Sequence, residues 1–395
     1  MSGATGWDEA RRIAWAAGAA RPLAVQTLPV EEADGRRLAV AANALVDLPT
    51  TDVSAMDGWA VAGSAPWRLD GTIAMGSPPP EEPLRPGTAR AITTGAAVPP
   101  GALGVLRLEH GEPAPNAPGS LRAIAGRTVD DGRDIRRRGE ELRRGELLVR
   151  AGARLTPPRL ALAAAGGHDT LDVLERPRVD LVITGDEVVT AGVPVPGTVR
   201  DAFGPSVPAM LSRLGAETAT RRIPDRLDAL VDLLATGRPY AFVTTGGTAG
   251  GRCDLLRQAI VAEGGSVEFA GVAMRPGHPV LFARTSAGIP VLGLPGNPLA
   301  AFACLLSFIP PWLDGASGRP LATLDEISAP ELPRREDERL LVPFEWRDGT
   351  PEPSRWRGSA MLRGLADADG MLVSPTGDGR VALLPAPWRS TALTA

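Results

Sequence analysis

The chain has 395 residues, more than one ordinary hydrophobic core holds, so several domains are expected. Its 46 acidic and 42 basic residues leave a net charge of −4, which excludes a general attraction to nucleic acid or to acidic membranes. All 42 basic residues are arginine, which excludes the lysine-dependent P-loop and Schiff-base chemistry.

Neither a membrane span nor a signal peptide is predicted. No apolar run approaches the roughly 20 residues that a span needs, and the N-terminal MSGATGWDEARRIA lacks an apolar signal core. Cys253 and Cys304 are too few for a zinc site or a disulfide framework, so we expect two reduced thiols. These features together predict a cytoplasmic protein.

The residue pattern of the first half of the chain changes twice. Helical patterns at residues 8–20 and 30–40 give way to a stretch dense in Gly and Pro at residues 47–139. Short apolar runs in that stretch lie at residues 59–62, 89–93, 104–108 and 120–124. Closely spaced short strands with turn residues between them are typical of a small β-barrel or sandwich.

Residues 146–164 turn helical again, with Pro157 and Pro158 placed to start a helix. We therefore predict that residues 47–139 form a β-rich domain inserted into an extended helical piece made of residues 1–46 and 140–176. Residues 177–318 alternate strand and helix patterns, and residues 319–395 read as β again.

Three buried-strand patterns in the α/β part each end in a polar or glycine-rich loop that is followed by helical sequence. The strands are at residues 179–184, 240–243 and 290–294, and the loops begin at Gly185, Gly246 and Pro295. Ligands of open α/β sheets bind at the carboxyl ends of the strands, so we expect these loops to meet there.

The second loop contains four glycines within six residues: Gly246, Gly247, Gly250 and Gly251. Glycine lets the backbone approach a ligand closely, and the N-terminus of the next helix attracts an anion. A phosphorylated small molecule is one natural occupant, and turn geometry alone is the other explanation that these residues leave open.

A polar loop with the sequence TTDVSAMDGWAV, at residues 50–61, precedes a strand of the β-rich insert. Asp52 and Asp57 are five residues apart and could hold a divalent cation, although solvated aspartates in a turn explain them as well.

Several of these motifs resemble, in order, those of the molybdopterin molybdenumtransferase family. DVSAMDGWAV is similar to the family's DNSAMDGYAV, and residues 93–109 and 132–142 look like its next two segments. ITGDEVV, TGGTAGGRCD, AMRPGHP and LPGNPLAAF are similar to STGDELV, SGGVSVGEAD, AIKPGKP and LPGNPVSA. The likeness extends over nearly the whole chain.

The resemblance implies a multidomain α+β protein. It would have a three-layer, Rossmann-like α/β domain with a parallel-rich sheet that binds molybdopterin, two small β-domains and an extended helical N-terminal domain. Family enzymes bind adenylylated molybdopterin and molybdate, hydrolyse the adenylate with a divalent cation, usually Mg²⁺, and release AMP with the finished cofactor. They are homodimers in which the first β-domain of one subunit faces the α/β domain of the other. Transient contacts with molybdopterin adenylyltransferase and with apo-molybdoenzymes are also implied.

The resemblance assigns site residues position by position. It assigns the cation and the attacking water to Asp57, Glu187 and Asp254. It assigns the pterin nucleotide to Thr94, Gly95, Asp186, Thr245, Gly246, Gly247, Gly251, Pro295, Gly296, Asn297 and Pro298. It assigns molybdate to Arg275, His278, Arg339 and Ser359.

Some positions depart from the family pattern. Arg275 and His278 stand where the family has the two lysines of KPGK, Ala249 replaces a serine, and Phe203 stands where the family usually has asparagine. Guanidinium still binds oxyanions, whereas a histidine is only partly charged near neutral pH. The retained Asp57, Glu187 and Asp254 favour an active transferase. The altered molybdate positions favour the alternative, a paralogue that binds or delivers the pterin without inserting metal.

Overall fold

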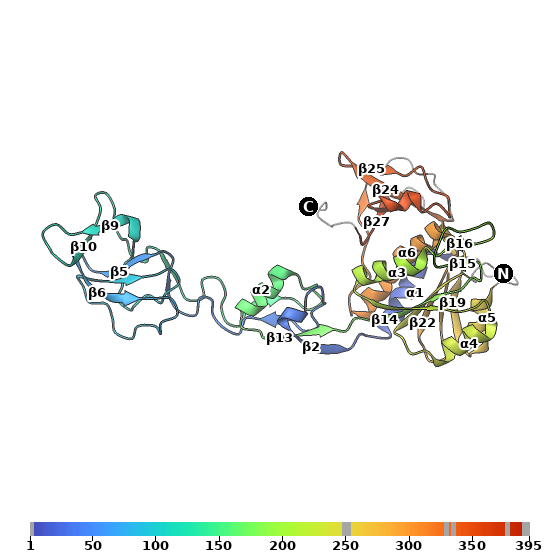
Figure 1. Ribbon diagram of the computed structural model, residues 1–395, viewed down its shortest axis with the longest axis horizontal. Helices are drawn as coiled ribbons and strands as arrows, with labels where there is room; N and C mark the ends of the chain where they lie inside the picture. Colours follow the sequence, from blue (N-terminus) through green and yellow to red (C-terminus); the bar gives the residue numbers. More distant parts are fainter. Residues whose placement is uncertain (1–3, 247–253, 328–331, 333–336, 376–379, 389–395) are drawn as a thin grey trace. The chain divides into compact units, whose positions relative to one another are not determined.

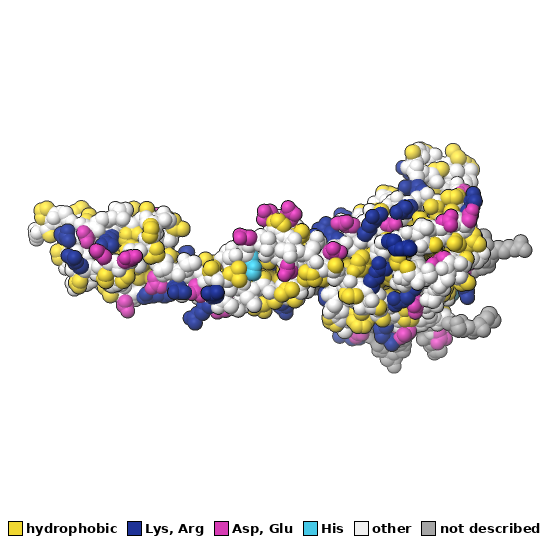
Figure 2. All heavy atoms as spheres, turned by 90° about the horizontal axis from the view of Figure 1, so that it is seen from below, with side chains coloured by type: hydrophobic (Ala, Val, Ile, Leu, Met, Phe, Trp, Pro, Cys, Tyr) yellow, Lys and Arg dark blue, Asp and Glu magenta, His cyan; other side chains and the backbone are white. Residues whose placement is uncertain are grey.

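The computed structural model describes residues 4–246, 254–327, 332, 337–375 and 380–388. Contacts within the chain define two compact units (Figure 1): unit 1 combines Met1–Val25 with Leu174–Ala395, and unit 2 is Gln26–Val173. The four-part division predicted above is finer than this and stays a prediction. On the face in Figure 2, basic and acidic side chains are interspersed, in keeping with the small net charge.

The centre of unit 1 is a six-stranded sheet in the order β17-β14-β18-β22-β21-β19. The first four strands are parallel, and β21 and β19 are antiparallel. The strands are β14 (Arg178–Ile183), β17 (Glu217–Arg222), β18 (Ala241–Thr245), β19 (Ser266–Ala270), β21 (Leu281–Arg284) and β22 (Pro290–Leu294). The three predicted strands are β14, β18 and β22, so this part of the fold prediction is confirmed.

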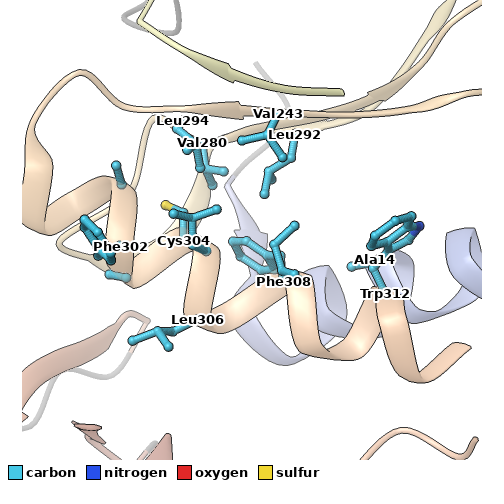
Figure 3. Packing of buried hydrophobic residues seen from close by; sticks show 14 of the residues in the cluster. Ala14, Val243, Val280, Leu292, Leu294, Phe302, Cys304, Leu306, Phe308 and Trp312 are labelled. Carbon is cyan, nitrogen blue, oxygen red and sulfur yellow. The ribbon is translucent and has the colours of Figure 1, made fainter. Parts of the chain in front are cut away.

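Helices cover this sheet: α3 (Phe203–Leu214), α4 (Leu227–Thr236), α5 (Leu255–Ala262) and α6 (Pro298–Ala316). Helix α6 is buried at every position except Pro298 and Pro310. Figure 3 shows Cys304 and Phe308 on its side toward Leu292 and Leu294 of β22, while Leu306 points the opposite way.

The expectation that no apolar run approaches the length of a membrane span is wrong for α6. An 18-residue window of this 19-residue helix has a mean hydropathy of 1.5, but 94% of that window is buried inside the protein. A core helix meets the same criteria of length and composition, because it too must be apolar on all sides.

The predicted helix at residues 8–20 is α1 (Trp7–Ala19), which lies in unit 1. Helix α1 packs against α6 rather than joining the helical piece at residues 140–176. A Cβ on Gly18 would lie 2.0 Å from the Trp312 carbonyl oxygen, and one on Gly315 would lie 2.1 Å from that of Trp15. The two backbones are thus in direct contact, which glycine alone permits.

A second sheet of unit 1 has the order β1-β20-β24-β26-β27-β23, with β25 paired to β24. Its strands are β1 (Thr5–Gly6), β20 (Val272–Arg275), β23 (Glu326–Ile327), β24 (Arg339–Arg347), β25 (Thr350–Pro353), β26 (Gly370–Val373) and β27 (Val381–Pro385), and α7 spans Arg363–Ala366. The predicted β character of the C-terminal part is confirmed. Two strands, β1 and β20, come from far earlier in the chain.

Unit 2 contains a six-stranded sheet in the order β8-β5-β7-β6-β10-β9, as the short apolar runs predicted. The strands are β5 (Gly58–Ala62), β6 (Trp67–Ile73), β7 (Thr88–Ile92), β8 (Gly104–Arg107), β9 (Gly111–Pro113) and β10 (Ser120–Ala123). Smaller ladders pair β2 (Val25–Pro29) with β13 (Thr170–Leu174), β3 (Ala42–Asn43) with β12 (Leu147–Val149), and β4 (Val53–Ser54) with β11 (Ile135–Arg136). The predicted multidomain α+β fold class is therefore confirmed.

Two helix predictions in unit 2 are wrong in extent. Residues 30–40 form only the 3-10 turn η1 (Val30–Glu32), because Gly35 adopts φ 69° and the next amides bond elsewhere. The Leu38 amide donates to the Ala153 carbonyl at 3.0 Å and the Ala39 amide to the Asp172 carbonyl at 2.8 Å. Helix α2 (Pro157–Ala165) begins at the predicted prolines, but the residues before it include β12.

Candidate functional site

The carboxyl ends of β14, β18 and β22 are joined to one another by hydrogen bonds. The Thr184 hydroxyl donates to the Thr245 carbonyl at 2.8 Å, and the Gly246 amide donates to the Leu294 carbonyl at 3.2 Å. The register agrees, with Ile183 opposite Thr245 and Thr245 opposite Leu294. The three predicted loops therefore start side by side.

Glu187 lies in the first of these loops. Gly185 has φ 121°, and a Cβ there would lie 3.1 Å from both carboxylate oxygens of Glu187, so the carboxylate folds back over this glycine. The side chains of Asp186 and Glu187 are exposed. Within the described residues, the Glu187 carboxylate makes no hydrogen bond or ion pair. It is free to bind a cation.

Asp254 follows the second loop and is the N-cap of α5. Its Oδ1 accepts a hydrogen bond from the Arg257 amide at 3.2 Å, the usual way in which a carboxylate satisfies a helix N-terminus. Gly246 ends the described part of this loop with φ 80°. The predicted Gly247 and Gly251 lie outside the described residues.

The third loop leads into α6. Pro295 is buried, whereas Gly296 and Asn297 are exposed, and a Cβ on Gly296 would meet no heavy atom within 4 Å. Asn297 occupies the N-cap position, but its side chain makes no capping hydrogen bond. The backbone here is thus exposed to open space at a helix N-terminus, the arrangement that suits an anion.

Ser359 and the Arg275–His278 turn lie beside this helix start. The Ala300 amide of α6 donates to the Ser359 carbonyl at 3.0 Å, and the Cys304 thiol donates to the Gly277 carbonyl at 3.5 Å. Three of the four predicted molybdate residues are therefore near the first turns of α6.

The cationic side chains of this group differ in how they are held. Arg275 is 62% exposed and pairs through Nε with Glu338 at 2.8 Å. His278 donates from Nδ1 to the Val272 carbonyl at 2.8 Å, which leaves Nε2 for another partner. Arg339 lies opposite Met274 across the β20–β24 pair.

The Arg339 guanidinium has structural partners. It donates to the Asp8 carboxylate at 2.6 Å and to the Ser374 carbonyl at 2.9 Å, and its side chain is only 19% exposed. Arg339 thereby ties α1 to the C-terminal sheet.

Asp57 and Thr94, predicted from separate motifs, are in contact in unit 2. Asp57 Oδ1 accepts hydrogen bonds from the Thr94 amide at 2.7 Å and from its hydroxyl at 2.9 Å. These bonds hold the pKa of the exposed Asp57 carboxyl below its usual value. Gly95, at φ 80°, donates its amide to the Ser54 carbonyl at 2.8 Å and closes the turn.

Asp201 is a buried carboxylate that the sequence did not single out. It accepts from the amides of Phe203 and Gly204 at the start of α3, and from Arg222 at 2.5 Å. Burial raises the pKa of its carboxyl, but these bonds outweigh burial and leave the pKa lowered. An aspartate two residues before a helix is a capping signal that could have identified it.

A pocket of about 390 Å³ lies along α3, beside Phe302 of α6 and the C-terminal part, within the size range of small-molecule sites. Its lining is mostly apolar and comprises Ala202, Ser206, Ala209, Met210, Arg213, Phe302, Leu362, Leu365, Ala366 and Trp388.

No group of three or more His, Cys, Asp or Glu side chains that could hold a metal is present among the described residues. Glu187 and Asp254 belong to unit 1, and Asp57 belongs to unit 2. The described residues of neither unit contain such a group by themselves.

The strand-end edge of this α/β protein carries two carboxylates, neither with an ion-paired arginine among the described residues, beside two helix N-termini, an arrangement that suits a phosphorylated small molecule. Comparison with known proteins agrees. Residues 6–167 match the family described as MoeA N-terminal region (domain I and II), and residues 180–315 match the probable molybdopterin binding domain.

Relatives with similar sequences and structures extend over nearly the full length. The chain is 34% identical to the molybdopterin molybdenumtransferase of Synechococcus elongatus, over 90% of this chain and 92% of that protein. It is 32% identical to molybdopterin molybdenumtransferase 2 of Mycobacterium tuberculosis, over 93% and 94%. The crystal structure of the MoeA protein from Pyrococcus horikosii superposes with a TM-score of 0.78 at 25% identity, covering 97% and 99%. The chain therefore belongs to the molybdopterin molybdenumtransferase family.

The Asp57–Thr94 contact predicts a measurable change in one pKa. In Thr94→Val the hydroxyl donor is lost and the amide donor remains, so the pKa of Asp57 should rise yet stay below its usual value. Carboxyl ¹³C shifts of labelled aspartate, followed against pH, measure it. Thr94→Ser keeps the hydroxyl and is the control. An identical Asp57 titration in Thr94→Val would contradict the contact.

Proposed function

We propose that the chain inserts molybdenum from molybdate into adenylylated molybdopterin and releases AMP. The observation that carries this proposal is the edge where β14, β18 and β22 end, with the unpaired carboxylate of Glu187 and open backbone at Gly296. Water attacks the phosphoanhydride, its oxygen stays on one phosphate, and the bond to the other phosphate breaks. AMP and the phosphate ester of the pterin are the two products of this hydrolysis. In the insertion step the two sulfurs of the pterin dithiol bond to molybdenum in place of one molybdate oxygen, which leaves as water with the two thiol protons.

The chain's own residues bind and orient the nucleotide. The N-termini of α5 and α6 supply partial positive charge for phosphate oxygens, and the positive-φ turn at Gly246 lets the backbone approach them closely. Thr94 and Gly95 shape the turn that presents Asp57. Asp186, Thr245, Asn297 and their neighbours are assigned to the nucleotide because they lie where β14, β18 and β22 end.

Glu187 and Asp254 would hold Mg²⁺, with Asp57 as the third carboxylate. Bound Mg²⁺ neutralises phosphate charge and so favours cleavage of the anhydride. Support for this assignment comes from the oxygen donor set and from the lack of an arginine partner for any of the three side chains in the described part of the chain.

Molybdate would be held as substrate by Arg275, His278 and Ser359. Guanidinium and imidazolium groups beside a helix N-terminus suit a tetrahedral dianion. Arg339 would contribute by fixing α1 and β24 behind Arg275, because its guanidinium already binds Asp8 and Ser374.

We also propose a homodimer in which Asp57 of one subunit completes the site of the other. Each unit of the chain carries only part of the carboxylate set, and a closed pair of subunits supplies both parts twice.

The central test is release of AMP from adenylylated molybdopterin with Mg²⁺ and molybdate. Asp254→Asn should slow it by a factor of about a hundred, because a charge is lost at the cation. Asparagine is as good an N-cap as aspartate, so α5 and nucleotide binding should survive. Unchanged hydrolysis would rule out the cation role. Nucleotide binding without hydrolysis in the wild type would instead support the binding paralogue.

His278→Lys should raise the affinity for molybdate. Lysine carries a full positive charge that attracts an oxyanion, whereas histidine is only partly charged near neutral pH. The measurement is a molybdate titration of both proteins at one pH, with His168→Lys in unit 2 as control. Matching titration curves for wild type and His278→Lys would show that the His278 ring does not bind molybdate.

Mixing two inactive variants tests the shared site. If Asp57 acts across the dimer, a heterodimer of Asp57→Asn and Asp254→Asn subunits has one intact site and one doubly altered site. A 1:1 mixture after subunit exchange should regain about a quarter of wild-type AMP release, since half the dimers are mixed and each has one of two sites. Light scattering confirms the dimer. No regained activity would mean that each site lies within one chain.

A further inference from the structure

The backbone around Asp57 is held at two points by two different segments. The Asp57 carbonyl accepts from the Leu108 amide at 3.0 Å, and the Ala55 amide donates to the Asp134 carbonyl at 2.8 Å. Leu108 begins the short turn η2 (Leu108–His110) after β8, whereas Asp134 directly precedes β11. The direction of the Asp57 carboxylate therefore depends on how these two segments are spaced.

One ion pair joins those two segments. Arg107, the neighbour of Leu108, donates from Nε to Asp134 Oδ2 at 2.9 Å and from Nη2 to Asp134 Oδ1 at 2.8 Å. This is the bidentate geometry that fixes distance and orientation together. The contacts form a closed loop that runs from Arg107 through Asp134, Ala55, Asp57 and Leu108 back to Arg107.

The backbone in this loop of contacts has little room to move. Gly58 lies opposite Arg107 in the β5–β8 pair, and a Cβ on Gly58 would lie 2.0 Å from the Leu106 carbonyl oxygen. Asp134 has φ 54°, which is uncommon outside glycine and is best tolerated by Asn and Asp. Its side chain is only 12% exposed.

The Asp134 carboxylate is largely shielded from water, whereas the Arg107 side chain is 32% exposed. Hydrogen bonds from Arg107 are the main cause of the lowered pKa of the Asp134 carboxyl. Arg133 lies 3.5 Å from the same carboxylate, so Asp134 stays charged with Arg107 as its principal partner. Exposed ion pairs on the same sheet, such as Arg122 with Glu112, join only neighbouring strands.

We propose that the Arg107–Asp134 ion pair positions the Asp57 carboxylate for its part in the reaction, an inference that rests on the function proposed above. Neither residue contacts the Asp57 side chain in the structure, so both act as positioning residues. Hydrogen bonds from Thr94 orient the Asp57 carboxylate directly. The ion pair acts on the backbone of Asp57, because it fixes the spacing of the two segments to which that backbone is bonded.

The test uses substitutions that remove the Asp134 carboxylate but keep the backbone conformation at this position. Asp134→Asn and Asp134→Gly both suit φ 54°, but both lose the charged bidentate contact. Each should lower kcat for AMP release by about ten-fold while KM for the nucleotide stays near wild type, because a displaced carboxylate costs rate more than binding. Arg107→Met should lower kcat by a similar factor. The double variant Arg107→Met with Asp134→Asn should lower kcat no further than either single change.

Two comparisons make the outcome decisive. Arg122→Met breaks the exposed pair with Glu112 and should leave kcat unchanged, and thermal melting confirms that every variant is folded. Wild-type kcat in both Asp134→Asn and Asp134→Gly would overturn the positioning role. Asp57→Asn is assayed beside them. If it too keeps full activity, the function proposed for Asp57 fails, whereas a loss confined to Asp57→Asn overturns only the ion-pair inference.

Discussion

Helix α6 must be covered on every side, because nearly all of its surface is apolar, and this requirement organises unit 1. The sheet strands β18 and β22 pack on one side (Figure 3), and α1 crosses it where Gly18 and Gly315 bring the two backbones together. The direction of the helix then places its N-terminus at the edge where the parallel strands end. The strand-end loops and the Arg275–His278 turn meet at that edge as a consequence of core packing.

The distribution of arginine separates structural carboxylates from those proposed to act. Asp134, Asp180 and Asp201 are each bonded to at least one guanidinium; Asp180 and Asp201 are buried, and the Asp134 side chain is partly buried. Asp57, Glu187 and Asp254 have no arginine partner in the described part of the chain, although 42 arginines are available. Hydrogen bonds to backbone amides or hydroxyls orient Asp57 and Asp254 without neutralising their charge. No neighbouring guanidinium compensates the negative charge of these carboxylates. Their oxygens can therefore bind a cation or accept a hydrogen bond from the attacking water.

Local pattern was sufficient for the strands and loops of the candidate site. Apart from Asp180 and Thr184, the runs at residues 179–184, 240–243 and 290–294 are apolar, as buried parallel strands require, so β14, β18 and β22 could be predicted. Residues 30–40 carry helix-like spacing as well, but the turn at Gly35 and amide bonds to Ala153 and Asp172 override it. Spacing along the chain cannot show that a distant carbonyl competes for an amide.

The amino-acid sequence by itself determined the fold class, the family and which residues carry charge or lack a Cβ. Only the tertiary structure decided what those charges contact. Arg339 and Arg275 both read as anion ligands, yet Arg339 is bonded to Asp8, more than 300 residues away, because β24 and α1 meet beside β20. Likewise, Arg107 and Asp134 carry no signal in sequence, and their closeness follows from the register of β5 against β8 and of β4 against β11. Ion pairs between distant segments depend on which elements share a core, and packing alone determines that.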